Sequence, residues 1–304
     1  MTEWVGANSD RYRLMMQYAK RYKTVLGSRM AYIDEGAGET ILFLHGNPAS
    51  SFIWRNIIPH LTKQARCVAP DLIGMGDSDK LTPSGPDRYR FVEHRKYLDA
   101  LYGQLDLGDR VVVVGQDWGS ALAFDWAYRN QDRLKGIVHT ESIPCAWTRA
   151  NFPIEGLFDA FLALRSPAGE ELVLNENRFV ETTMPAGTAR ALTQSEMAEY
   201  RRPFREPGEA RRATLTWPRE VPFEGLPADT DRIIRDYAGW LPSAKVPKLF
   251  IDAEPGFIVT GKIREWVRGW ANQQIVSVKS KHFVQEDAPE EMGRAVSDWY
   301  ARLT

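Results

Sequence analysis

Short apolar segments alternate with longer amphipathic segments along most of this chain. Runs rich in Val, Ile, Leu and Phe indicate buried strands, and apolar residues at helical spacing indicate helices between them. The alternation predicts an α/β fold, with a mostly parallel central sheet flanked by helices. The predicted strands are Thr40–Leu44, Cys67–Pro70, Arg110–Val114, Gly136–Thr140, Lys248–Ala253 and Gln274–Val278, and the predicted helices are Phe91–Leu107, Ala121–Tyr128 and Glu290–Leu303.

The pattern changes between Ser142 and Pro222, where helices and loops punctuated by prolines replace the strands. An insertion at the carboxyl ends of parallel strands would cover the crevice in which open α/β sheets bind ligands. We therefore predict a core domain of residues 1–141 and 223–304, with an inserted helical cap, or lid, of residues 142–222. A further helix, without an assigned role, is expected around Asp10–Tyr22.

Composition narrows the expected partners to small molecules. The 39 Lys and Arg residues balance 40 Asp and Glu residues, so no basic field attracts nucleic acid or an anionic membrane. Cys67 and Cys145 lack the number and spacing needed for a disulfide framework or a zinc site. No apolar stretch is long enough to span a bilayer. A cytoplasmic protein without a structural metal is expected.

A candidate nucleophile lies where four valines are followed by Gly-Gln-Asp-Trp-Gly and then by a helical pattern. Gly115 and Gly119 permit a sharp strand-to-helix turn that raises Asp117 above the sheet, beside backbone N–H groups. This predicted turn resembles the nucleophile elbow of the α/β-hydrolase fold, although Asp117 could also serve only to cap the helix. A carboxylate nucleophile displaces a leaving group from saturated carbon and becomes an ester, which must then be hydrolysed.

Hydrolysis of an ester needs a base, and the chain has five histidines. His45 belongs to a turn motif, and His139 lies within a predicted strand. His60 and His94 fall at polar positions of helical patterns. His282 follows the last predicted strand, where the chain order of nucleophile, acid and histidine in this fold places the base. We therefore predict that His282 activates water.

The histidine needs a carboxylate to fix its tautomer and to stabilise the imidazolium. Glu141 follows the predicted strand Gly136–Thr140, and Asp252 and Glu254 lie near the end of the next strand. Glu141 is favoured because it stands where a buried strand ends, at the edge expected to carry the chemistry, whereas Asp252 could simply be solvated.

A second turn motif, His-Gly-Asn-Pro, follows the predicted strand Thr40–Leu44. It is similar to the loop that supplies one backbone N–H to an oxyanion hole, the other coming from the residue after the nucleophile. Those donors would be the amides of Asn47 and Trp118. Their side chains add two neutral N–H donors, which suit a departing halide ion.

Together these motifs resemble the haloalkane dehalogenases, particularly the subfamily whose catalytic acid is a Glu after the sixth core strand. The resemblance extends over nearly the whole chain, through Met30–Gly36, His45–Pro48, Asp71–Lys80, Ala210–Pro218 and His282–Pro289.

The resemblance implies that Asp117 is the nucleophile, His282 the base and Glu141 the acid, with Asn47 and Trp118 as the halide-binding pair. It also implies hydrolysis of small apolar haloalkanes to alcohol, halide and a proton without any cofactor, by a monomer or weak homodimer. The apolar pocket walls that it implies are Phe152, Phe161, Phe179, Pro218 and Ile258.

Two departures from the family pattern stand beside the expected site. Gln116 replaces a histidine often found before the nucleophile, and Ala186 and Gly187 are small where the family often has a bulkier lid residue. Both changes bear on access to the pocket and leave the predicted chemistry in place.

Three other functions share part of this pattern. Epoxide hydrolases share the Asp nucleophile but usually use two lid tyrosines as acids, and residues 142–222 contain only Tyr200. Coelenterazine-type luciferases, which are cofactor-independent oxygenases, resemble this dehalogenase subfamily and share its triad, and residues 136–142 and 255–257 look like them too. A receptor on the same fold is disfavoured by the intact Asp117, Glu141 and His282.

Overall fold

An eight-stranded sheet forms the centre of the computed structural model, which describes residues 18–152 and 157–303. Its strand order is β1-β2-β4-β3-β5-β6-β7-β8. Strands β3 to β8 are all parallel, so the predicted mostly parallel sheet is confirmed, and each of the six predicted strands overlaps one of them. The strands are β1 (Arg21–Val25), β2 (Ser28–Glu35), β3 (Thr40–Leu44), β4 (Arg66–Pro70), β5 (Val111–Asp117), β6 (Leu134–Ser142), β7 (Lys248–Pro255) and β8 (Gln273–Ser280).

Residues 10–17 of the helix predicted around Asp10–Tyr22 lie outside the described residues, and the prediction is wrong for residues 18–22, which are not helical. Arg21 and Tyr22 begin β1, which pairs with β2 in antiparallel register. The two strands are joined by Leu26 and Gly27, both with positive φ, as a tight hairpin turn between twisted strands requires.

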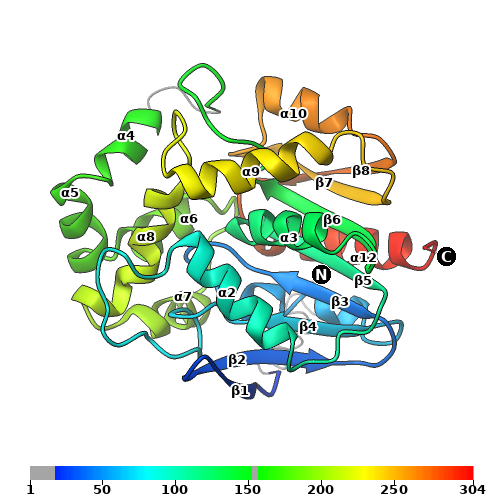
Figure 1. Ribbon diagram of the computed structural model, residues 1–304, viewed down its shortest axis with the longest axis horizontal. Coiled ribbons are helices and arrows are strands. Elements are labelled where there is room, and N and C mark those ends of the chain that lie inside the picture. The colour runs from blue at the N-terminus through cyan, green and yellow to red at the C-terminus, as the bar shows by residue number, and fades with distance from the viewer. Residues whose placement is uncertain (1–17, 153–156, 304) are drawn as a thin grey trace, which may run out of the picture.

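Helices cover both faces of the sheet (Figure 1). Helices α2 (Phe91–Tyr102), α3 (Trp118–Arg129) and α9 (Ala228–Trp240) lie over one face, and α12 (Pro289–Tyr300) lies over the other. The prediction extended α2 to Leu107, but the helix ends at Gly103, a poor helix former. Leu105 is buried from the turn that follows. The other core helices are η1 (Ser51–Trp54), η2 (Ile58–His60), α10 (Gly261–Arg268) and α11 (Val284–Asp287).

Between β6 and α9 the described chain forms a separate group of short helices, at the left of Figure 1. The group lies beyond the carboxyl ends of the parallel strands. Its elements are α4 (Leu157–Ala163), α5 (Pro167–Glu170), η3 (Glu171–Asn175), η4 (Phe179–Thr183), α6 (Met184–Ala186), α7 (Gln194–Arg201), η5 (Arg202–Phe204), η6 (Gly208–Arg211) and α8 (Arg212–Glu220).

The strand order predicts a crevice at one point along the carboxyl ends of the parallel strands. The chain passes from β3 to β4 on one side, while β5 pairs with β3 on the other side. Ligands of open α/β sheets bind where the order reverses in this way. The loop after β3 and the turn after β5 therefore meet there. Within residues 18–152 and 157–303, no helix is both long and apolar enough to cross a bilayer.

Candidate active site

Asp117 occupies the sharp turn between β5 and α3, with φ 52° and ψ −132°. Such a backbone is rarely adopted by a residue with a side chain, and it is typical of functional turns. Both flanking glycines are required by close contacts. A Cβ atom at Gly119 would lie 2.0 Å from the Leu44 carbonyl oxygen, and one at Gly115 would lie 2.5 Å from the Ser120 Cα atom. The sequence prediction of a nucleophile elbow thus corresponds to the observed backbone.

The loop after β3 packs directly against the Asp117 carboxylate. A Cβ atom at Gly46 would lie 2.2 Å from Asp117 Oδ1, so only glycine allows this approach. The backbone N–H of Asn47 donates a hydrogen bond of 2.8 Å to Oδ1. Burial raises the pKa of Asp117, while the charge of His282 and the backbone N–H groups of Asn47 and Trp118 counteract this rise. The carboxylate is therefore desolvated but held by donors.

His282 links the other two predicted triad residues. Its Nδ1 atom lies 3.0 Å from Glu141 Oε2, and its Nε2 atom lies 3.7 Å from Asp117 Oδ2. Burial lowers the pKa of His282, but the hydrogen bond to Glu141 and the charges of Asp117 and Glu141 together raise it above its usual value. The imidazole is thus oriented by one carboxylate while its far nitrogen faces the other.

Glu141 owes its direction to an irregularity at the end of β6. Gln116 pairs with Thr140 and Asp117 pairs with Ser142, so Glu141 is an extra, bulged residue with φ 40°. Bulges re-aim side chains in this way. The backbone N–H groups of the loop 257–259 donate to its carboxylate at 3.0, 2.7 and 3.3 Å.

The alternative acid, Asp252, is engaged elsewhere. It is buried rather than solvated, and its carboxylate pairs with Arg264 at 3.1 Å and with Arg268 at 2.5 Å. The structure therefore brings Glu141 to His282, whereas Asp252 on β7 pairs with two arginines of α10.

The remaining histidines lie away from the reacting groups. His45 is buried and accepts the backbone N–H of Leu72, which fixes the loop before Asn47. His94 was expected at a polar position, but it is fully buried and stacks on Trp217 with ring centroids 4.2 Å apart. An apolar ring system can bury a neutral imidazole, and burial lowers the pKa of His94 to about 3.

Helix α8 contacts both residues of the predicted halide-binding pair, Asn47 and Trp118. The side-chain amide of Asn47 donates to the Thr214 carbonyl oxygen at 3.1 Å, which fixes the side chain and leaves its second N–H free of that contact. The Trp118 ring stacks on Trp217 with centroids 4.7 Å apart. No described residue accepts a hydrogen bond from the Trp118 indole N–H. Both donors are thus oriented before any ligand arrives.

Aromatic and aliphatic side chains enclose a cavity above Asp117. Its volume is about 80 Å³, room for several water molecules at roughly 10–15 Å³ each. The predicted wall residues Phe152, Phe161, Phe179, Pro218 and Ile258 all line it, as do Asn47, Asp117, Trp118 and His282. The prediction missed the lining residue Thr183 and four apolar lining residues that apolar character alone could not separate from core residues: Ile143, Trp147, Val221 and Phe257.

The helices of residues 142–222 are tied to the loop that carries His282. The Gly187 carbonyl oxygen accepts the backbone N–H groups of His282 and Phe283 at 2.9 and 3.1 Å. A Cβ atom at Gly187 would lie 2.8 Å from the Phe283 ring, so the small residue noted in the sequence is what permits this contact.

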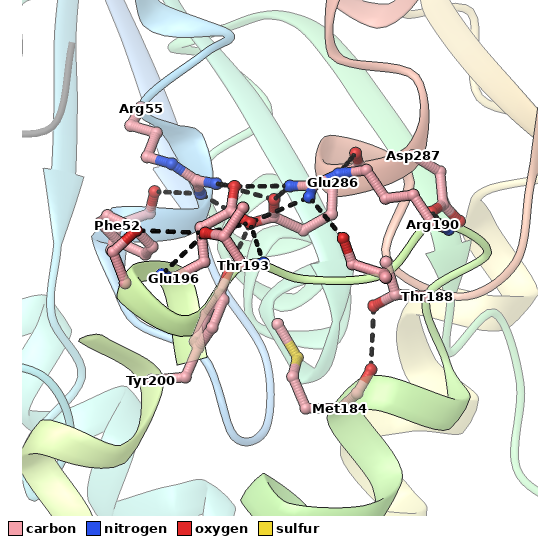
Figure 2. A network of polar contacts seen from close by, with 12 residues as sticks. Phe52, Arg55, Met184, Thr188, Arg190, Thr193, Glu196, Tyr200, Glu286 and Asp287 are labelled. Carbon is pink, nitrogen blue, oxygen red and sulfur yellow. Dashed lines mark hydrogen bonds and ion pairs between the residues drawn. The ribbon is translucent and has the colours of Figure 1, made fainter. Parts of the chain in front are cut away.

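A buried cluster of charges reinforces that tie (Figure 2). Arg55 makes a two-pronged pair with Glu286 at 2.6 and 2.7 Å, four residues beyond His282. Arg190 and Glu196 join the same pair, and the Tyr200 hydroxyl donates to Glu286. Two positive and two negative charges therefore balance inside the molecule. Tyr200 is turned into this cluster and is not among the residues that line the cavity.

Comparison with known proteins identifies similar chains. The sequence profile of the alpha/beta hydrolase fold matches residues 39–289. A haloalkane dehalogenase of Sphingobium indicum is 56% identical over 93% of this chain and 96% of its own. Another from Mycolicibacterium smegmatis is 50% identical over 93% and 91%. The crystal structure of haloalkane dehalogenase DbeA from Bradyrhizobium elkani covers 94% of this chain and 98% of its own, with 37% identity and a TM-score of 0.88.

A more distant relative has a different activity. The coelenterazine h 2-monooxygenase of Renilla reniformis is 42% identical over 92% of this chain and 89% of its own.

Proposed function

Since this chain belongs to the haloalkane dehalogenases of the α/β-hydrolase fold, we propose that it hydrolyses haloalkanes through a covalent ester on Asp117. The observation that carries this mechanism is one cavity in which Asp117 and His282 meet the N–H donors Asn47 and Trp118. Residues 142–222 would act as the cap that completes this cavity.

In the first step, Asp117 displaces the halide. Oδ1 is held by the Asn47 backbone, so Oδ2 is the oxygen that attacks the carbon of the carbon–halogen bond. The carbon–oxygen bond forms as the carbon–halogen bond breaks, and both bonding electrons leave with the halide. The Asn47 amide and Trp118 indole stabilise the departing anion, and the apolar walls strengthen these interactions by excluding water.

In the second step, His282 activates water. Its Nε2 atom takes a proton while the water oxygen attacks the ester carbonyl carbon, and Glu141 stabilises the imidazolium that forms. The backbone N–H groups of Asn47 and Trp118 hold the oxyanion of the tetrahedral intermediate. Its collapse releases the alcohol and restores the carboxylate. The proton then leaves His282, so water and haloalkane give alcohol, halide and a proton.

A halide-release assay tests the reaction class. We expect release from small chloro-, bromo- and iodoalkanes, and loss of release in Asp117→Ala. Unchanged release in that variant would rule out the carboxylate as nucleophile. Cytoplasmic location and a monomeric or weakly dimeric state stay predictions, to be checked by fractionation and by sedimentation.

The luciferase alternative rests on the similarity to the Renilla reniformis enzyme. Adding coelenterazine separates the two functions, because sustained light emission with turnover would support the oxygenase and its absence would leave the hydrolase. The epoxide hydrolase alternative lacks a lid tyrosine among the described cavity residues.

A further inference from the structure

We propose that Gln116 is a positioning residue that holds the His282 imidazole in its neutral form. Gln116 is fully buried at the end of β5, one residue before Asp117. Its side-chain Nε2 atom lies 2.9 Å from His282 Nε2 and 3.2 Å from the His282 carbonyl oxygen. The inference extends the proposed function, because it concerns the nitrogen that takes the proton from water.

The donors and acceptors at this contact are determined by their neighbours. The Glu141 carboxylate accepts from His282 Nδ1, so the proton of the neutral ring is on Nδ1 and the lone pair is on Nε2. The His282 carbonyl oxygen can only accept, so the Gln116 nitrogen, rather than its oxygen, faces the ring. Gln116 therefore donates to the Nε2 lone pair.

This hydrogen bond opposes the charges around the ring. Asp117 from the β5–α3 turn and Glu141 from β6 both favour the imidazolium. The ring and its backbone also contact three groups that carry no charge: the Phe257 ring, the Phe283 ring and the Gly187 carbonyl oxygen. Arg264 on α10 lies beyond Glu141, where it reaches the Ala253 and Pro255 carbonyl oxygens.

A donor at Nε2 stabilises only the neutral ring, because the imidazolium would place an N–H against an N–H. Asp117 Oδ2, at 3.7 Å from the same nitrogen, is too distant for a hydrogen bond. Gln116 thus supplies the directional contact to Nε2 in the resting site. With this hydrogen bond, His282 stays unprotonated down to a lower pH than it would beside Asp117 and Glu141 alone.

Histidine titration by ¹⁵N NMR of the full chain measures this effect directly, with His282→Phe to assign the resonance. Gln116→Met keeps the shape but removes the donor, and we expect the His282 pKa to rise by about one pH unit. Gln116→Glu adds an acceptor and a charge, so its rise should be larger. Gln285→Met is the matched control: Gln285 is equally buried near His282 but has no hydrogen-bond partner, and no shift is expected.

The acid limb of the pH profile of kcat/KM for halide release should move to higher pH in Gln116→Met, and further in Gln116→Glu. An unchanged His282 pKa in folded Gln116→Met and Gln116→Glu would overturn the proposal, as would an equal shift in Gln285→Met. If Gln116→Met does not fold, the direction in Gln116→Glu decides, and a fall or no change contradicts the proposal. The NMR titration does not require dehalogenase activity, so failure of the proposed function would appear separately in the halide assay.

Discussion

Two indole rings stack beside the nucleophile, yet only one faces the cavity. Trp118 lines it, whereas Trp217 lies behind Trp118, and its indole N–H has no hydrogen-bond partner within the described part of the chain. Trp118→Phe removes the N–H donor but keeps an aromatic ring, and we expect kcat/KM for halide release to fall by about 10²–10³-fold. Trp217→Phe is the control, with an expected loss of less than about tenfold. Equal losses in both variants would mean that stacking, not donation, matters.

Glu141 raises the pKa of His282 through its hydrogen bond and its charge, against the effect of burial and together with the charge of Asp117. Because Glu141 raises the pKa of His282, activity should fall as the pH drops through that raised value. Glu141→Gln removes the charge, so the acid limb should move to lower pH while kcat falls by about 10²–10⁴-fold. Asp252→Asn should leave the position of the limb unchanged, although it lowers the Tm. A pH–rate profile of both variants distinguishes the two candidate acids.

The three residues of the proposed triad could be singled out in the sequence because their signals are local. The glycines around Asp117 and the loop position of His282 are visible in a few consecutive residues. Gln116 and Gly187 could not be assigned in this way. Their roles depend on contacts with a loop more than ninety residues away, and only the folded chain shows which polar atoms meet.

At the level of elements, the turn between β5 and α3 has the least tolerance for change. Gly119→Ala would place a methyl group against the Leu44 carbonyl oxygen, and we expect it to destabilise the fold by more than about 3 kcal/mol. Gly239→Ala, in helix α9 with no atom near the added carbon, should instead stabilise by about 0.5–1 kcal/mol. Urea unfolding measures both. Similar stabilities would show that the elbow can relax.

The buried parallel strands could be predicted, and the antiparallel edge could not. The interior of the sheet is built from continuous apolar runs, as in β5, whose residues are all buried. β1 is an edge strand whose residues Arg21, Tyr22 and Thr24 are exposed, so it carries no apolar signal. Its hairpin turn uses Leu26 rather than Asn or Asp, which removed the usual sequence marker.

For the whole molecule, the cluster in Figure 2 fastens the helices of residues 142–222 to the core. Glu286→Gln would leave Arg55 and Arg190 partly uncompensated, and we expect a loss of about 3–5 kcal/mol in the free energy of unfolding. Asp159→Asn breaks an exposed pair with Arg149 and should not change the Tm measurably. Equal Tm values for the two variants would contradict a structural role for the cluster.

The same cluster makes the stability of the folded protein depend on pH in the acidic range. Burial would raise the pKa of Glu196, but its hydrogen bonds and the charges of Arg190 and Arg55 lower it to about 2. A lowered folded-state pKa means that this stabilisation is complete above the usual value of 4.5 and is lost as the pH falls towards 2. The Tm of Glu196→Gln should therefore depend less on pH in that window than the Tm of the unaltered protein.

The covalent ester is most directly tested by mass spectrometry of His282→Phe after mixing with a small bromoalkane. This variant can form the ester but cannot activate water, so we expect one equivalent of bromide and an adduct of one alkyl group on the peptide that contains Asp117. Continued turnover without an adduct, or an adduct on another residue, would contradict the account.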